Sequence, residues 1–348
     1  MNLLKQTINS ISKLDYFHME ESKKRLDSLI KPVGSLGKLE DICIKLSGIY
    51  QSKYFDVQKK AIIAFAADHG VYEEGVSPVP QAITKIQIPN YVKGVSGVGV
   101  LSKFAGAKVV AVDVGINCDE KLEGVLDYKI RKGTDNMSKG PSMSKEEAIK
   151  SIEIGIEIAN NLIDEGYKVL GIGEMGIGNT TPSTAIISVF GDFNPKDITG
   201  MGCGLDSNGI VHKANVIEKS IKLNCPDKKD ALDVLSKVGG FEIGSMAGVI
   251  LAASSRRVPV VIDGFISYAS ALIAYNLCPL CKDYIIASHF SAEPASQKAL
   301  SLLGLDPMLN MNMRLGEGSG AALAFNIIDA ANYMYENMLT FEEANMNI

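Results

Sequence analysis

Short apolar runs that alternate with amphipathic stretches dominate the chain after residue 60. Five of these runs are rich in β-branched and small apolar residues, and they cover residues 61–66, 108–114, 168–172, 258–262 and 284–287. Apolar runs of about four to eight residues, separated by helical stretches, are typical of strands buried on both faces of a parallel sheet. The pattern therefore predicts an α/β fold built on a mostly parallel sheet.

Both ends of the chain have a helical pattern instead. In residues 38–50 the apolar positions recur at spacings of three and four, which places on one helix face Leu39, Ile42, Leu46 and Ile49. A proline and two glycines at 31–37 predict a turn before this helix. At the other end, residues 320–338 predict a helix whose apolar face consists of Leu323, Ile327, Ala330, Ala331 and Met334. We expect the two ends to pack together as a small second domain.

The composition fits a large folded core without a charged partner. The chain has 348 residues, of which 46% are hydrophobic, and its net charge of −5 comes from mixed signs. This balance argues against nucleic acid or an anionic membrane as a partner. The longest apolar tract, 258–274, is broken by Asp263 and Gly264, so it predicts strand, turn and helix rather than a membrane span. We expect a soluble protein of the cytoplasm.

The cysteines give little reason to expect a metal. Only Cys278 and Cys281 among the six have the CxxC spacing, which is found in redox-active sites and in halves of zinc sites. A structural zinc site normally needs a second Cys/His pair, and none stands at ligand spacing. We interpret the cysteines as ordinary reduced thiols.

Polar residues and glycines gather at the carboxyl ends of the predicted strands. They are DHG at 68–70, DVG at 113–115, GEMG at 173–176, DG at 263–264 and SHF at 288–290. Open α/β sheets bind ligands outside the carboxyl ends of their strands. A single Asp-Gly pair is usually only a turn, but five such strand ends predict a pocket.

Two glycine-rich turns are candidates for binding phosphate. The first, at 171–181, joins a predicted strand to a helix, where backbone N–H groups and the helix N-terminus favour an anion. Its glycines at 173, 176 and 178 are three and two residues apart, and no Gly-Lys-Ser/Thr follows, so we predict a single phosphate held by N–H groups, Asn179 and Thr180. The second, at 200–204, precedes a helical stretch with Lys213, which either neutralises phosphate or is a solvated surface residue like most lysines.

The segment RLGEGSG at 314–320 is the best candidate for catalysis. It places Glu317 among glycines, where a ligand can approach the chain closely and a carboxylate can act as a base. The alternative is a helix N-terminus whose first turn carries a stabilising acid. Glu174 and Asp263 are further carboxylates at predicted strand ends. The sequence lacks a GxSxG elbow and an HExxH motif, which disfavours hydrolases and metalloenzymes.

The polar segment 131–144 has no helical or strand pattern. It contains glycines and Pro141, so we predict a long surface connection. Such a connection is either a mobile lid or an inert loop, and the sequence favours neither.

Seven segments together resemble the nicotinate-nucleotide:dimethylbenzimidazole phosphoribosyltransferases of cobalamin lower-ligand synthesis. In chain order they are KPVGSLGKLE (31–40), ADHGV (67–71), GEMGIGNTTP (173–182), LSKVGGF (235–241), DGF (263–265), SHFSAE (288–293) and MRLGEGSG (313–320). The resemblance implies a large Rossmann-like domain at 56–317, with helices on both faces of its sheet. It also implies a small helical domain from 1–55 and 318–348, and a homodimer with the active site near the interface.

The resemblance also implies the reaction. Ribose 5-phosphate passes from nicotinate mononucleotide to 5,6-dimethylbenzimidazole or a related base, giving α-ribazole 5′-phosphate and nicotinate. The leaving group is already a pyridinium and no pyrophosphate departs, so we expect neither metal nor cofactor. Glu317 would take the proton of the attacking base, and Glu174 would orient the ribose or stabilise positive charge there.

The same resemblance assigns a substrate site. The phosphate and ribose neighbourhood comprises Gly176, Asn179, Thr180, Gly202, Gly204 and Lys213. The base pocket comprises Val79, Gln87, Met175 and Leu315, and the site is completed by Asp263 and Gly316. The family often has a small polar residue where this chain has Val79, which leaves the natural base open.

Two other functions remain as alternatives. A sensor that kept the fold but lost catalysis would not need Glu317 and Glu174, and both are present. An enzyme acting on another phosphorylated sugar would be favoured if nicotinate mononucleotide failed to bind, which a thermal shift would show.

Overall fold

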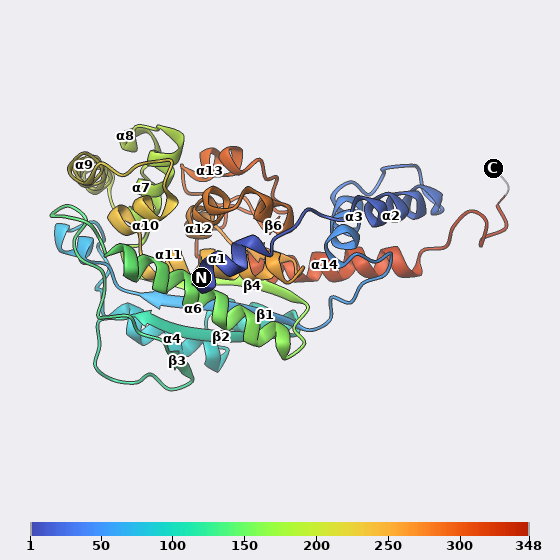
Figure 1. Cartoon of the computed structure of the whole chain (residues 1–348), viewed down its shortest axis with the longest axis horizontal. Helices are drawn as coiled ribbons and strands as arrows, with labels where there is room; N and C mark the ends of the chain where they lie inside the picture. The colour runs from blue at the N-terminus through green and yellow to red at the C-terminus, as the bar shows by residue number, and fades with distance from the viewer. Residues whose placement is uncertain (1, 347–348) are drawn as a thin grey trace.

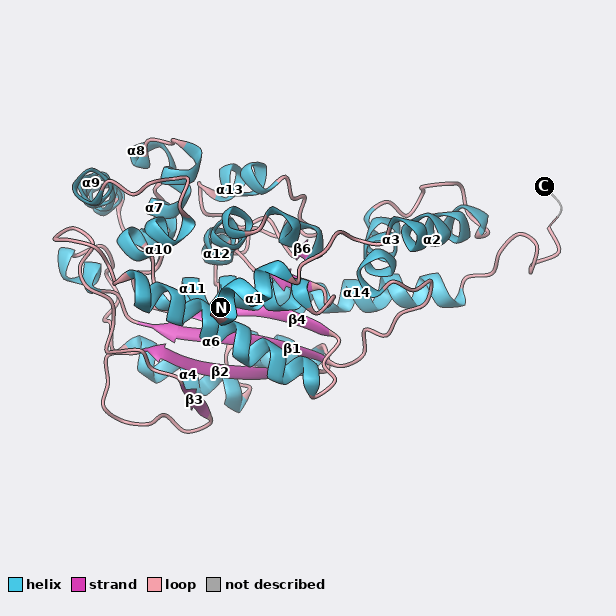
Figure 2. Ribbon diagram, viewed as in Figure 1, coloured by secondary structure: helices cyan, strands magenta, loops and turns pink. Residues whose placement is uncertain are grey.

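The computed structural model describes residues 2–346 and contains one six-stranded parallel sheet within that range (Figures 1 and 2). The strand order is β3-β2-β1-β4-β5-β6. The strands are β1 (Lys60–Ala67), β2 (Ala107–Gly115), β3 (Val125–Asp127), β4 (Val169–Met175), β5 (Val260–Ile262) and β6 (Ile285–Ala287). The predicted α/β fold with a parallel sheet is confirmed, and all five predicted strands are present. The short edge strand β3, which is partly exposed, was not predicted.

Helices cover both faces of the sheet. Those near the N-terminus are α1 (Leu3–Asn9), α2 (Tyr16–Ser28), α3 (Lys38–Tyr50), α4 (Ile83–Lys93), α5 (Gly97–Phe104) and α6 (Lys145–Asp164). Those after β4 are α7 (Thr180–Gly191), α8 (Pro195–Ile198), α9 (Ser207–Asn224), α10 (Ala231–Val238), α11 (Phe241–Ser255), α12 (Phe265–Leu277), α13 (Ser296–Leu303) and α14 (Ser319–Asn337). Two 3₁₀ helices are η1 (Gly70–Glu74) and η2 (Pro279–Tyr284).

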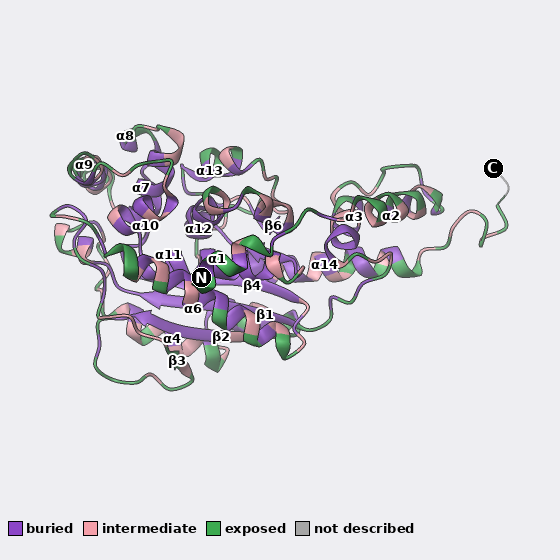
Figure 3. Ribbon diagram, in the orientation of Figure 1, coloured by how far each residue is buried: buried purple, intermediate pink, exposed green. Residues whose placement is uncertain are grey.

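Alternate side chains of the strands enter two separate hydrophobic cores. Ile63 and Phe65 of β1 join the core that contains α6 and α11, whereas Ile62 and Ala64 join the core that contains α3, α4 and α14. Every residue of β1 and β4 is buried (Figure 3). This burial on both faces explains why their sequences are continuously apolar rather than alternating.

The strand order reverses between β1 and β4, which positions the functional site. β1 pairs with β2 on one side and β4 on the other, so connections leave the sheet in opposite directions from this point. Doubly wound sheets open a crevice at the carboxyl ends of such strands. Asp68 follows β1 there, while Glu174 and Met175 are the last residues of β4.

Helices α2 and α3 lie beside the C-terminal part of α14, away from the sheet (Figure 1). Helix α3 has the predicted bounds. The predicted apolar face of α14 is only partly confirmed: Ala331 is buried and Ile327 and Met334 pack against the core, but Ala330 is exposed. The most buried positions are instead Ala321, Phe325, Ile328 and Tyr335. Small alanines approach the sheet closely, so bulk hydrophobicity did not identify the packed face.

The division into 1–55 with 318–348, and 56–317, stays a prediction. Helix α1 packs against α6 and α11, and the Leu4 backbone N–H donates to Glu153 of α6 at 3.2 Å. The first half of α14 packs on β1, β4 and β5. Both chain ends therefore also contribute to the core around the sheet.

The segment 131–144 is not the surface connection that its polarity predicted. Met137, Ser138, Ser142 and Met143 are buried. Backbone hydrogen bonds join the segment to Asp68, Gly115 and the last turn of α10. None of its residues lines the cavity described below, so a lid function has no support. No helix within residues 2–346 is both long and apolar enough to cross a membrane.

Candidate active site

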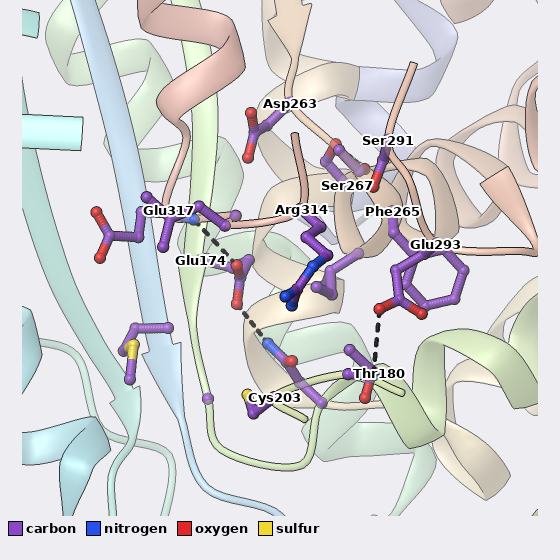
Figure 4. Close-up of a pocket in the computed structure, with 18 of the residues that line it drawn as sticks. Glu174, Thr180, Cys203, Asp263, Phe265, Ser267, Ser291, Glu293, Arg314 and Glu317 are labelled. Atoms are coloured by element: carbon purple, nitrogen blue, oxygen red, sulfur yellow. Dashed lines mark hydrogen bonds between the residues drawn. The ribbon is translucent and has the colours of Figure 1, made fainter. Parts of the chain in front are cut away.

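A cavity of about 630 Å³ opens at the carboxyl ends of β4, β5 and β6 (Figure 4). Helix α4 forms one wall, the turn around Gly202 another, and residues 314–317 close it from the side of α14. Of the predicted site residues, those that line it are Val79, Gln87, Glu174, Met175, Gly176, Asn179, Thr180, Gly202, Asp263, Leu315, Gly316 and Glu317. Gly204 and Lys213 are not among its lining residues.

Glu317 is held by hydrogen bonds at one end of the cavity. Its Oε1 accepts from Gln87 Nε2 at 2.9 Å, and its Oε2 accepts from the backbone N–H of Val98 at 2.9 Å. Val98 lies in the first turn of α5, where the helix dipole favours a negative charge. Each oxygen keeps a lone pair, so the carboxylate is fixed in place yet able to accept a proton.

Glycines let the loop of Glu317 pass close to β4. Glu317 has φ +66°, between Gly316 at +81° and Gly318 at +101°. Such angles are costly for a residue with a side chain and cluster at functional sites. A Cβ on Gly173 of β4 would stand only 2.1 Å from the Glu317 carbonyl oxygen. The glycines therefore allow a close backbone contact rather than simply leaving space for a ligand.

Asp263 anchors the same loop to the sheet. Its carboxylate accepts from the N–H groups of Gly318 at 3.1 Å, Gly320 at 2.7 Å and Ala321 at 3.3 Å. These groups belong to the start of α14, so Asp263 satisfies the unpaired donors of a helix N-terminus. The alternative predicted for Glu317 was an acid that stabilises a helix N-terminus. At α14 this role belongs to Asp263.

Glu174 lies between Glu317 and the opposite side of the cavity (Figure 4). Its oxygens accept from the Glu317 backbone N–H at 3.2 Å and from the Asn179 side chain. Burial raises the pKa of Glu174 from 4.5 to about 7; the two hydrogen bonds oppose this, and the nearby charge of Asp263 adds to it. A carboxyl group with this pKa changes charge near neutral pH, as groups in active sites often do.

We predict that Glu174 gives the activity an acid limb near pH 7. If the ionised form is needed, kcat/KM rises as pH increases through about 7, and a Glu174→Gln variant has low activity without that limb. Since the folded protein binds the proton more tightly than the unfolded chain, the contribution of Glu174 to stability falls between pH 4.5 and about 7. Rate and thermal-unfolding profiles against pH measure both effects. A wild-type rate profile that is flat across this range would contradict the assignment.

Lys213 is fully buried, which excludes the alternative of a solvated surface residue. Its Nζ donates to Thr180 Oγ1 at 2.6 Å, and a Cβ on Gly202 would lie 3.3 Å from Nζ. Burial lowers the pKa of Lys213 to about 8, while the carboxylate of Glu293 opposes this. Lys213 therefore lies behind the cavity wall, where it contacts Thr180 and the turn at Gly202.

Arg314 is a cationic cavity residue to which the sequence assigned no role. Its side chain extends between Glu174 and the side of the cavity that carries Thr180 and Cys203 (Figure 4). No hydrogen bond or ion pair to Arg314 occurs within residues 2–346. An unpaired guanidinium on a cavity wall suits a phosphate or carboxylate, which it can bind through two parallel hydrogen bonds.

Other lining residues were also missed. They are Ile83, Tyr91, Ile177, Cys203, Gly264, Phe265, Ile266, Ser267, His289, Ser291 and Glu293. Several of them stand in the DGF and SHFSAE segments, so their position after a strand was an available signal. Ile83 and Tyr91 line the cavity from α4, which does not follow a strand and therefore has no such signal.

Comparison with known proteins decides the family. A phosphoribosyltransferase family model matches residues 11–346. The chain is 65% identical over 346 residues to the nicotinate-nucleotide–dimethylbenzimidazole phosphoribosyltransferase of Clostridioides difficile (strain 630), with 99% of each chain covered. The protein of that name from Alkaliphilus metalliredigens (strain QYMF) is 55% identical over 349 residues, with 100% of each covered. The chain belongs to this phosphoribosyltransferase family.

A solved structure supports the assignment at the level of the fold. The nicotinate-nucleotide–dimethylbenzimidazole phosphoribosyltransferase from Thermus thermophilus superposes with a TM-score of 0.91 at 33% identity. The match covers 96% of this chain and 100% of that one. The predicted family is therefore confirmed. Within residues 2–346, no group of three or more His, Cys, Asp or Glu side chains is arranged to hold a metal ion.

Proposed function

We propose that this phosphoribosyltransferase transfers ribose 5-phosphate from nicotinate mononucleotide to 5,6-dimethylbenzimidazole or a related base. The products are α-ribazole 5′-phosphate and nicotinate. The observation that carries the proposal is the polarity of a single cavity. A hydrogen-bonded carboxylate, Glu317, lies at one end. The cation Arg314 lines the cavity towards the other end, where Lys213 stands behind Thr180. The volume of about 630 Å³ is within the usual range for small-molecule sites.

The base would bind at the Glu317 end. Val79, Ile83, Met175 and Leu315 give this part of the cavity apolar side chains. One azole nitrogen attacks C1′ of the ribose while the other carries a hydrogen that becomes acidic as the new bond forms. Glu317 accepts that proton, and Gln87 and Val98 hold its carboxylate in position meanwhile. Glu174, between the two ends, stabilises the positive charge that develops on the ribose.

The phosphate would bind at the opposite end. Arg314 supplies a free guanidinium, and the N-terminus of α7 presents Thr180 with Lys213 behind it. Glu293 accepts from the Gly202 N–H at 3.2 Å and so fixes the turn that forms this wall. The nicotinate leaves on the side of C1′ away from the attacking base, and its departure neutralises the pyridinium.

We predict that Arg314→Met weakens nicotinate mononucleotide binding by roughly 10- to 100-fold, since charge-assisted hydrogen bonds contribute about 1.5–3 kcal/mol. KM for nicotinate mononucleotide should rise while kcat changes little, because the lost contact is present in both ground and transition states. Steady-state kinetics measure this. Arg256→Met, which removes an ion pair to Asp164 outside the cavity, is the matched control. Equal KM values in the two variants would remove Arg314 from the phosphate site.

The proposed reaction is tested by nicotinate release from nicotinate mononucleotide, followed by chromatography with and without 5,6-dimethylbenzimidazole. Release only with the base supports the transfer. Tight binding of nicotinate mononucleotide without release would favour the sensor alternative. A failure to bind would favour an enzyme for another phosphorylated sugar.

We also propose that the chain acts in the cytoplasm as a homodimer. Apolar side chains that are more than half exposed gather on α4, on α5 and between them, namely Ile86, Val95, Val100 and Phe104. Leu315 is exposed as well and lies against Gly97 at the start of α5, which connects this surface to the edge of the cavity. An unpaired apolar surface of this kind favours association. Sedimentation at several concentrations measures the oligomeric state.

A further inference from the structure

His289 is a cavity residue to which the reaction described above gives no role. It follows β6, is only 2% exposed and lines the cavity. Its Nδ1 lies 3.0 Å from the Ser288 hydroxyl and 3.7 Å from Asp263 Oδ1. A Cβ on Gly320 would stand 2.0 Å from Nδ1, so the start of α14 packs tightly against the ring. The imidazole is therefore held in one orientation.

The hydrogen bonds of Ser288 determine which ring nitrogen carries the hydrogen. Ser288 Oγ donates its single hydrogen to the backbone carbonyl of Asp263 at 3.0 Å, and a carbonyl oxygen can only accept. Oγ must then accept from Nδ1 of His289. The Asp263 carboxylate, close to the same nitrogen, also favours a hydrogen there. Nε2 of the neutral ring is left as an acceptor, and no group within residues 2–346 donates to it.

The ligands of the proposed function, on which this inference rests, offer few hydrogen-bond donors to that nitrogen. Phosphate oxygens and the nicotinate carboxylate only accept, and the N–H of the attacking base faces Glu317. The ribose hydroxyls remain. We infer that His289 binds the ribose of nicotinate mononucleotide, with Nε2 accepting a hydrogen bond from one of its ring hydroxyls.

This contact would couple the ribose to the general base. Asp263 contacts His289 and, through Gly318, Gly320 and Ala321, also holds the loop of Glu317. One buried carboxylate thus positions both the acceptor for the ribose and the acceptor for the proton. Such positioning keeps C1′ aligned with the attacking nitrogen, where small displacements slow the reaction greatly.

Two variants separate the roles of the two ring nitrogens. In His289→Asn the amide nitrogen replaces Nδ1 and no group replaces Nε2, whereas in His289→Gln the amide reaches the position of Nε2. Their kcat/KM is compared with wild type on nicotinate mononucleotide and on its 2′-deoxy and 3′-deoxy analogues. We expect removal of the bonded hydroxyl to lower kcat/KM about tenfold in wild type, because one ordinary hydrogen bond contributes about this factor. In His289→Asn the same removal should lower kcat/KM less than about twofold. His289→Gln should regain part of the sensitivity.

Several outcomes would overturn the inference. If kcat/KM on both deoxy analogues falls as much in His289→Asn as in wild type, the ring does not bind the ribose. If His289→Asn instead loses only the preference for nicotinate over nicotinamide mononucleotide, a charged ring binds the pyridine carboxylate. If wild type releases no nicotinate with any base, the proposed function fails, and this inference fails with it.

Nitrogen-15 NMR of the wild-type protein labelled at its four histidines tests the tautomer without any substitution. We expect the hydrogen on Nδ1, and a shift of the Nε2 resonance when nicotinate mononucleotide binds. The deoxy analogue that lacks the bonded hydroxyl should produce a smaller shift. A hydrogen on Nε2 in the complex would overturn the inference.

Discussion

Replacing Glu317 by glutamine should reduce kcat by roughly 10²- to 10⁴-fold, the usual contribution of a positioned general base. The amide oxygen can still accept from the Val98 N–H, and the amide NH2 can donate to the Gln87 side-chain oxygen once that amide turns over, so the loop should keep its conformation. It cannot accept the proton of the attacking base. Nicotinate mononucleotide binds away from this carboxylate, so its dissociation constant should change little. Single-turnover kinetics and calorimetry measure the two quantities.

The matched control for this variant is Glu20→Gln. Glu20 is exposed on α2 and does not line the cavity, so the same chemical change should leave both kcat and binding at wild-type values. A Glu317→Gln enzyme that turns over at close to the wild-type rate would show that the proton goes elsewhere. Loss of nicotinate mononucleotide binding together with turnover would instead point to a structural role.

Replacing Gly173 by alanine should damage both stability and activity. The added Cβ would stand 2.1 Å from the Glu317 carbonyl oxygen and 2.8 Å from its carbonyl carbon. These are backbone atoms, so no side-chain rotation relieves the contact and the loop at 316–318 must move. Overpacking of this kind costs about 1–3 kcal/mol, and a displacement of about 1 Å at the reacting groups can cost about 10²-fold in rate. Thermal unfolding and kcat measure the two losses.

Gly140→Ala is the control for the alanine substitution. A Cβ there would meet nothing within 4 Å, and the residue does not have a left-handed backbone conformation. The free energy of unfolding of Gly140→Ala should stay within about 0.5 kcal/mol of wild type, as for most surface substitutions. Full activity in Gly173→Ala would contradict the close approach of β4 and the Glu317 loop.

The sequence predicted the elements whose burial is simple. The continuous apolar run at 61–66 is buried on both faces of the sheet, so its pattern indicated a central parallel strand. Strand β3 has three partly exposed residues and therefore no such pattern. On α14 the packed face is formed partly by Ala321, Ala324 and Ala331, whose small size permits close packing but gives weak hydrophobic periodicity.

The site was predictable where a residue's position in a strand or turn decides its place. Glu174 lies at the end of β4, next to its last residue, and Asp263 follows β5. The topology therefore brings the two together at the carboxyl ends of neighbouring strands. Lys213 was not predictable in this way, because its burial depends on Thr180, 33 residues away. The tautomer of His289 depends on which hydrogen bond the Ser288 hydroxyl makes, and no sequence pattern encodes that choice.

The most direct test of the account is the reaction itself. Purified protein is incubated with nicotinate mononucleotide and 5,6-dimethylbenzimidazole, and both products are quantified by chromatography, with the anomer of the riboside phosphate assigned by NMR. We expect one nicotinate for each α-riboside phosphate, and no nicotinate without the base. Nicotinate release that is independent of the base, or a β-riboside product, would contradict transfer by direct attack on C1′.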